Sequence, residues 1–250
     1  MPWRQWILAC AVACVAAAAA ATGFRPAGPR VYLWAWETAT DLRGVDGSRA
    51  GVAFLAGSLL LRADDVIPRP RLQPLRVADR TTLIAVVRID LDPRGRPSFS
   101  VDQQDEASDL LVGFARRHPE ASAVQVDFDA PISGRVFYAG LLARLRRALP
   151  TSTALSMTAL ASWCQGDPWI VSLPVDEAVP MLFRMGPDAR HVRVGLQQGR
   201  DFALPLCRHS LGLSTDEPFA WRPAGRRVYL FNPRGWNDAS ALGALSEYGQ

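Results

Sequence analysis

The segment Val124–Pro131, with the sequence VQVDFDAP, constrains the fold of this chain most strongly. Side chains alternate along a β-strand, so one face of this strand is apolar while the other carries Gln125, Asp127 and Asp129. Two aspartates at this spacing stand about 7 Å apart, and each opposes ionisation of the other unless a cation or water intervenes. The column of carboxylates predicts an active site. The alternative is an edge strand whose polar face lies in water.

A helix is expected directly after this strand. Apolar residues recur near helical spacing over residues 135–149, and Ser133 and Gly134 precede them. The two elements form a βα unit. In a parallel barrel the apolar face of each strand meets the helices, and polar residues at the carboxyl ends of the strands line the mouth, where active sites lie.

Apolar runs of strand length recur along the whole chain. Besides 124–131, the predicted strands are 31–36, 51–61, 82–91, 154–161, 178–185, 210–215 and 227–232. Eight strands and a length of 250 residues predict an α/β fold of the (β/α)8 TIM-barrel-like type, with one domain over residues 30–250. The alternative is an open α/β sheet, although the chain has no glycine-rich nucleotide-binding motif.

Irregular loops are expected to replace some of the barrel helices. Residues 62–80 contain three prolines among arginines and aspartates, which predicts a loop after the second strand. Substantial helices are predicted only over 102–118, 135–149 and 238–248. Residues 189–198 are ambiguous between helix and strand because they contain two valines.

The first 22 residues have the pattern of a signal peptide. Arg4 precedes an alanine-rich apolar run over residues 7–20, and small residues follow. The run is too short for a comfortable membrane span, so no stable membrane insertion is expected after its removal. The expected location is therefore periplasmic or secreted. Lipoprotein attachment through Cys10 or Cys14 is the alternative.

Cys164 and Cys207 are the two cysteines that remain after the leader. Two thiols in an oxidising compartment predict a disulfide, and two buried free thiols are the alternative. Neither cysteine has a second cysteine or a histidine at ligand spacing, so we expect no metal site and no cofactor. The net charge of +4 comes with evenly spread arginines that are not interleaved with aromatic residues, so we expect no nucleic-acid partner.

Several stretches of the chain resemble an uncharacterised bacterial family, domain of unknown function 3142. The stretches are 125–129, 137–142, 155–164, 175–186 and 213–218. This resemblance covers most of the chain after the leader, and it implies an exported barrel similar to the glycoside hydrolases with no established activity. The 124–131 strand is also distantly similar to the chitinase-like family 18 signature, Asp-x-Asp-x-Glu. Pro131 stands where that signature has its catalytic glutamate, so the chitinase mechanism does not transfer directly.

Other candidate residues follow the predicted strands. Glycoside hydrolysis needs two carboxyl groups, and Glu37 or Glu217 is expected to complete the site with Asp127 and Asp129. Arg88 is the expected charge partner of Asp127. Aromatic faces and polar side chains suit sugar rings. The expected substrate-binding residues are Trp36, Arg88, Gln125, Trp163, Asp216, Asn232 and Trp236.

These patterns predict a barrel that binds, and in its enzymatic form hydrolyses, a polysaccharide or oligosaccharide. In that form Asp129 is the acid or base and Asp127 stabilises developing positive charge. The alternative is a non-catalytic envelope module that holds a glycan or a protein in the same mouth. Pro131 favours the second reading, and the paired aspartates favour the first.

Overall fold

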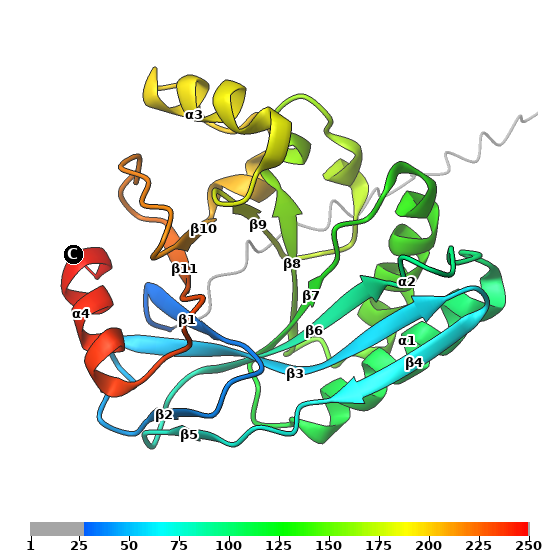
Figure 1. Cartoon of the computed structure of the whole chain (residues 1–250), viewed down its shortest axis with the longest axis horizontal. Coiled ribbons are helices and arrows are strands. Elements are labelled where there is room, and N and C mark those ends of the chain that lie inside the picture. Colours follow the sequence, from blue (N-terminus) through cyan, green and yellow to red (C-terminus); the bar gives the residue numbers. More distant parts are fainter. Residues whose placement is uncertain (1–27, 250) are drawn as a thin grey trace, which may run out of the picture.

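The computed structural model describes residues 28–249, which form a closed barrel of eight parallel strands (Figure 1). β1 closes the barrel by pairing with both β11 and β3. The predicted (β/α)8 TIM-barrel-like fold is therefore confirmed, and the open-sheet alternative is wrong. In their order around the barrel, the strands are β1 (Val31–Ala35), β11 (Arg227–Phe231), β10 (Ser210–Ser214), β9 (Glu177–Met181), β8 (Ala154–Leu160), β7 (Ala123–Asp127), β6 (Leu83–Leu91) and β3 (Ala50–Arg62).

Four α-helices lie within the described residues, so the outer ring of the barrel is incomplete. They are α1 (Val101–Arg117), α2 (Arg135–Ala148), α3 (Ala189–Gln197) and α4 (Asp238–Tyr248). Short 3-10 turns cover Ile132–Gly134, Ala161–Cys164, Trp169–Ser172, Gly186–Asp188 and Pro205–Arg208. The ambiguous segment is thus the helix α3, whose Val192 and Leu196 are both buried.

Residues 62–80 are more regular than the predicted loop. β4 (Asp65–Pro70) pairs antiparallel with the end of β3, and β5 (Leu75–Val77) pairs with β2 (Thr40–Leu42). Pro68 and Pro70 are tolerated because β4 is an edge strand, where a missing backbone N–H breaks no ladder on the open side. The prolines excluded a helix here but did not exclude a strand.

β7 lies between β6 and β8, so the edge-strand interpretation of the acidic segment is wrong. The strand ends at Asp127, earlier than predicted, and Asp129 lies just beyond it. Val124, Val126 and Phe128 are buried in the outer core, where the Phe128 ring contacts Tyr138 of α2 at 5.1 Å between centroids. The apolar face therefore meets the helix, as the alternation predicts.

Cys164 and Cys207 form the predicted disulfide, with their Cα atoms 5.9 Å apart. The bond joins the turn after β8 to the turn before β10, and it closes a loop with a sequence separation of 43. The predicted leader, residues 1–22, and Cys10 and Cys14 lie outside the described residues. No helix among residues 28–249 has the length and apolar character needed to cross a membrane.

A buried ionic network fills the amino-terminal end of the barrel. Glu177, the first residue of β9, is 0% exposed and accepts hydrogen bonds from the hydroxyls of Ser156 and Tyr229, each at 2.8 Å. Ser210 donates a further hydrogen bond, and Arg227 forms an ion pair with the same carboxylate. This network occupies the end of the barrel opposite the mouth.

Replacement of Glu177 by alanine should destabilise the protein by about 3–5 kcal/mol, because it leaves the largely buried Arg227 cation without its counter-ion. Glu177→Gln should cost less, since the amide retains an oxygen acceptor for Ser156 and Tyr229. Urea unfolding of the three proteins measures the difference. A Glu177→Ala variant within about 0.5 kcal/mol of the native protein would show that the network is not structural.

Candidate functional site

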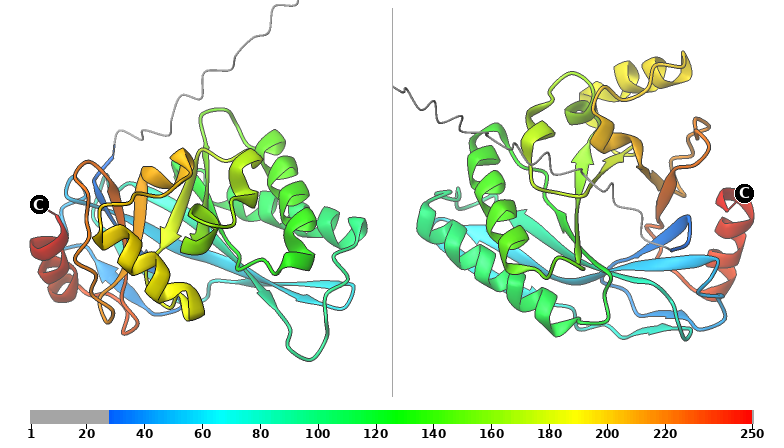
Figure 2. Two further views of the ribbon diagram at one scale, coloured as in Figure 1. Left: turned by 90° about the horizontal axis from the view of Figure 1, so that it is seen from above. Right: turned by 180° about the vertical axis from the view of Figure 1, so that it is seen from behind.

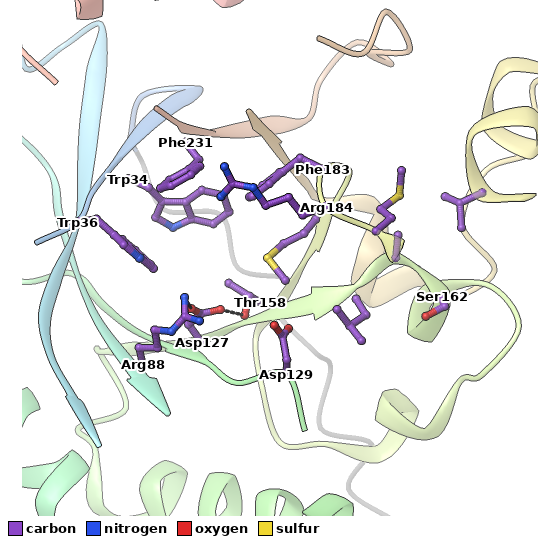
Figure 3. Close-up of a pocket in the computed structure, with 15 residues that line it drawn as sticks. Trp34, Trp36, Arg88, Asp127, Asp129, Thr158, Ser162, Phe183, Arg184 and Phe231 are labelled. Atoms are coloured by element: carbon purple, nitrogen blue, oxygen red, sulfur yellow. Dashed lines mark hydrogen bonds and ion pairs between the residues drawn. The ribbon is translucent and has the colours of Figure 1, made fainter. Parts of the chain in front are cut away.

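A pocket of about 200 Å³ opens at the carboxyl ends of the strands (Figure 3). Its walls come from the ends of β1, β6, β7, β8, β9 and β11 and from α3. Figure 3 shows Asp127 and Asp129 on one side of the pocket and Trp34, Phe183 and Phe231 on the other. Both predicted carboxylates thus lie at the barrel mouth, where parallel barrels place their sites.

Aromatic side chains form one wall of the pocket. Trp34 contacts Trp36 and Phe183 edge-on at centroid distances of 6.5 and 6.2 Å, and Phe183 stacks on Phe231 at 5.7 Å. Edge and offset contacts of this kind stabilise aromatic clusters beyond simple burial. The cluster presents a rigid apolar surface to the cavity.

The opposite wall is charged. Thr158 donates a hydrogen bond of 2.6 Å to one oxygen of Asp127, and Arg88 approaches the other oxygen at 3.4 Å. Arg88 also pairs with Asp90 at 2.7 Å. The predicted pairing of Arg88 with Asp127 is therefore present. No hydrogen bond or ion pair from residues 28–249 engages the carboxylate of Asp129, so this group is available to a ligand.

Burial raises the pKa of both pocket aspartates above 3.8. For Asp127, desolvation is the largest cause, and the positive charge of Arg88 and the hydrogen bond from Thr158 oppose it. Asp129 is still exposed to solvent, so its desolvation is partial, but this desolvation outweighs the attraction of Arg88 and raises the pKa. A carboxyl group with a raised pKa holds its proton at higher pH, which general acid catalysis requires.

Gln125 lies one layer below the pocket and is 0% exposed. Its side-chain oxygen accepts a hydrogen bond from Trp34 Nε1 at 2.8 Å, and its nitrogen donates to the Ser156 hydroxyl at 3.0 Å. Gln125 therefore does not line the pocket. Gln125 instead fixes the orientation of Trp34, because the indole N–H has a defined partner.

Glu37 and Glu217 do not join the two aspartates in the pocket. Glu37 lines a neighbouring cavity with Trp36, Arg88 and Asp90. The Glu217 carboxylate accepts hydrogen bonds from the backbone N–H of Arg184, the shorter at 3.1 Å, and thereby holds the loop that carries Phe183 over the pocket.

Asp216 belongs to the same anchor as Glu217. It accepts a hydrogen bond from Ser214 and lies 3.4 Å from the Arg184 guanidinium, which in turn covers the Phe231 ring at 5.1 Å. Arg184 has a φ of 51°, a left-handed conformation that is costly for a non-glycine residue and needs such support. Asp216 and Glu217 thus position the loop and do not line the cavity.

Three predicted binding residues, Trp163, Asn232 and Trp236, do not line the mouth pocket. Trp163 is 2% exposed and packs edge-on against Trp169, and Trp236 is 3% exposed and donates to the Trp34 carbonyl at 3.0 Å. Asn232 accepts a hydrogen bond from the Arg234 N–H at 3.1 Å within a turn. Position near a strand end does not distinguish such residues from ligand contacts, because the outer core also reaches these ends.

Sequence reasoning missed Thr158 and Phe183 as pocket residues. Both lie on the inward face: Thr158 follows the inward Ser156 by two residues, and Phe183 follows Met181 in the same way. Strict alternation along each strand would have found them. Trp36 and Arg88, in contrast, lie in the pocket as predicted from their strand positions.

The described residues contain no group of three histidine, cysteine, aspartate or glutamate side chains arranged to hold a metal ion.

No protein-family model matches this chain, and no curated protein does either. The similarity to domain of unknown function 3142 therefore stays a prediction.

One solved structure with a similar chain path is the chitinase RmChi1 from Rhizomucor miehei. The alignment covers 73% of this chain and 68% of that one, with 13% sequence identity and a TM-score of 0.44. At this level of similarity we infer nothing about activity from the chitinase. The barrel is defined here by its own strand pairing.

The raised pKa of Asp127 predicts a pH-dependent stability. A carboxyl group whose pKa is higher in the folded state binds more protons there, so its contribution to stability falls as the pH rises through that pKa. The unfolding free energy of Asp127→Asn, minus that of the native protein, should therefore increase as the pH rises from about 4. Urea titrations between pH 4 and pH 8 measure this difference. A difference that decreases with pH would contradict the assignment.

Proposed function

We propose that the pocket binds a glycan and hydrolyses it. The supporting observation is the pairing of an aromatic wall with a charged wall across one cavity at the barrel mouth. Sugar rings present apolar faces to aromatic rings and hydroxyl groups to charged side chains. Trp36 supplies an aromatic face, while Arg88, Asp127 and Thr158 supply donors and acceptors.

In the proposed reaction Asp129 is the general acid. Its carboxyl group donates a proton to the glycosidic oxygen as the bond from that oxygen to the sugar carbon breaks. Asp127, in its ionised form, stabilises the positive charge that develops on the sugar, and Arg88 and Thr158 hold its carboxyl group in place. A water molecule then adds to the sugar carbon and gives its proton to the Asp129 carboxylate, which restores the acid.

Asp90 replaces Glu37 and Glu217 as the third carboxylate of this proposal. It shares a small cavity with Asp127, Asp129 and Arg88.

Pro131 has no proton to donate and precedes the 3-10 turn at Ile132–Gly134. The proposed acid is therefore Asp129, whereas the chitinase-like signature places its acid at position 131.

Asp129→Asn should lower the rate of glycan hydrolysis by about 10²–10⁴-fold, because the amide retains the shape of the side chain but cannot transfer a proton. Binding should persist. Release of reducing sugar from a panel of polysaccharides measures the rate, and Asp109→Asn, on the exposed surface of α1, is the matched control. Full activity in Asp129→Asn would refute the assignment, and binding without turnover by the native protein would establish the non-catalytic alternative.

Trp36→Ala should weaken glycan binding by about tenfold or more, because a half-buried indole in a pocket supplies much of the stacking surface. Trp221→Ala is the matched control, since Trp221 is also half-buried but packs against Phe202 away from the pocket. Calorimetry with the glycan found in the panel measures both affinities. Equal losses in the two variants would show that the Trp36 effect is not local.

We also propose that the protein is exported and acts in the periplasm or outside the cell. The disulfide supports this proposal, because such bonds persist in oxidising compartments. Amino-terminal sequencing of the mature protein should give a start between about residues 20 and 27. An intact Met1 on cytosolic protein would contradict export.

A further inference from the structure

β3 is 13 residues long and extends far beyond the barrel wall. Its pairing with β1 ends at Phe54, so residues 55–62 continue for roughly 26 Å past that contact. β4 pairs with this extension on one side and β6 pairs with it on the other. We name residues 55–62, 65–70 and 88–91 the platform.

α1 supports one face of the platform (Figure 2). Gly57 is required for this packing, because a Cβ atom there would lie 2.3 Å from the Phe114 ring. Gln103 of α1 donates hydrogen bonds to the carbonyls of Ala63 and Asp65, at 2.9 and 3.1 Å, and so fixes the β3–β4 turn. The packing of α1 and the hydrogen bonds of Gln103 therefore hold the platform in a fixed position.

The other face of the platform carries two cavities, and the first of them shares lining residues with the mouth pocket. Trp36 and Arg88 line both the mouth pocket and the next cavity, which reaches Ser58 and Arg69. Leu72 lines the same cavity and is 83% exposed, so an apolar side chain stands in water at its rim. Arg69 also lines a third cavity farther along the platform.

The far end of this path is positively charged. The third cavity contains Arg62, Arg69 and Arg94 but only one acidic residue, Asp92. Asp92 pairs with Arg62 at 2.6 Å. No ion pair or side-chain hydrogen bond from residues 28–249 engages the Arg69 guanidinium, which is exposed. The mouth end of the path is acidic instead, because Asp90, Asp127 and Asp129 surround Arg88 there.

We propose that the ligand is an acidic glycan that runs from the mouth along the platform and places an anionic substituent on Arg69. This inference rests on the proposed function and specifies its ligand class. A guanidinium forms paired, charge-assisted hydrogen bonds with carboxylate and sulfate groups alike. The aspartates at the mouth disfavour an anion there, so the acidic group is selected at a distance from the bond that is cleaved.

The test is calorimetric binding of defined hexamers at 0.15 M salt, a concentration that screens long-range attraction. One pair of probes is a galacturonate hexamer and its carboxyl-reduced form, and the other is a sulfated carrageenan hexamer and its desulfated form. At least one acidic hexamer should bind about tenfold more tightly than its neutral form. The pair that shows this preference identifies carboxylate or sulfate as the substituent.

Arg69→Glu should remove the preference for the acidic hexamer, and Arg69→Lys should retain part of it. Arg30→Glu carries the same change in net charge at the opposite end of the barrel and should retain it fully. Equal affinity for acidic and neutral forms, or an unaltered preference in Arg69→Glu, would overturn the inference. Trp36-dependent binding of the neutral forms would in that case leave the proposed function intact. Failure of all four hexamers to bind would overturn the inference, while the polysaccharide panel decides the proposed function separately.

Discussion

Closure of the barrel is the constraint on which the rest of the structure depends. β1 pairs with β3 on one side and with β11 on the other, so Trp34 has a backbone neighbour in Ala53 and another in Phe231. Closure gives every strand one face toward the interior and one toward the outer core. Alternate residues of each strand are thereby assigned to separate environments, and the carboxyl ends of all eight strands meet at one mouth.

The interior is arranged by depth. The ionic network around Glu177 fills the amino-terminal end, apolar side chains such as Tyr32 and Val86 fill the middle, and the charged pocket opens at the carboxyl end. Gln125 connects the middle to the mouth because it holds the Trp34 indole from below. The Trp34 wall of the site is thus held by Gln125, whose side-chain oxygen and nitrogen are both hydrogen-bonded, which keeps its geometry fixed.

The incomplete ring of helices also has a consequence for the surface. No helix follows β3 before β6, and the β4 hairpin occupies that place in the chain. A hairpin lengthens a sheet, whereas a helix would cover its face. The platform is therefore available beside the mouth, and its arginines extend the charge pattern of the molecule beyond the pocket.

The sequence by itself determined the eight strands, the main helices and the inward direction of Asp127 and Asp129, because alternation and helical spacing are local properties of the chain. It also determined the Cys164–Cys207 pair, because these are the two cysteines that remain after the leader. It did not determine which residues at strand ends reach the cavity. Trp36 and Trp163 both follow apolar runs, yet one lines the pocket and the other lies in the outer core. Glu217 and Asp129 both follow strands, but the Glu217 carboxylate accepts a hydrogen bond from the Arg184 backbone N–H and the Asp129 carboxylate does not. Only the tertiary structure decided these cases, because burial and hydrogen bonding depend on partners that are distant in the sequence.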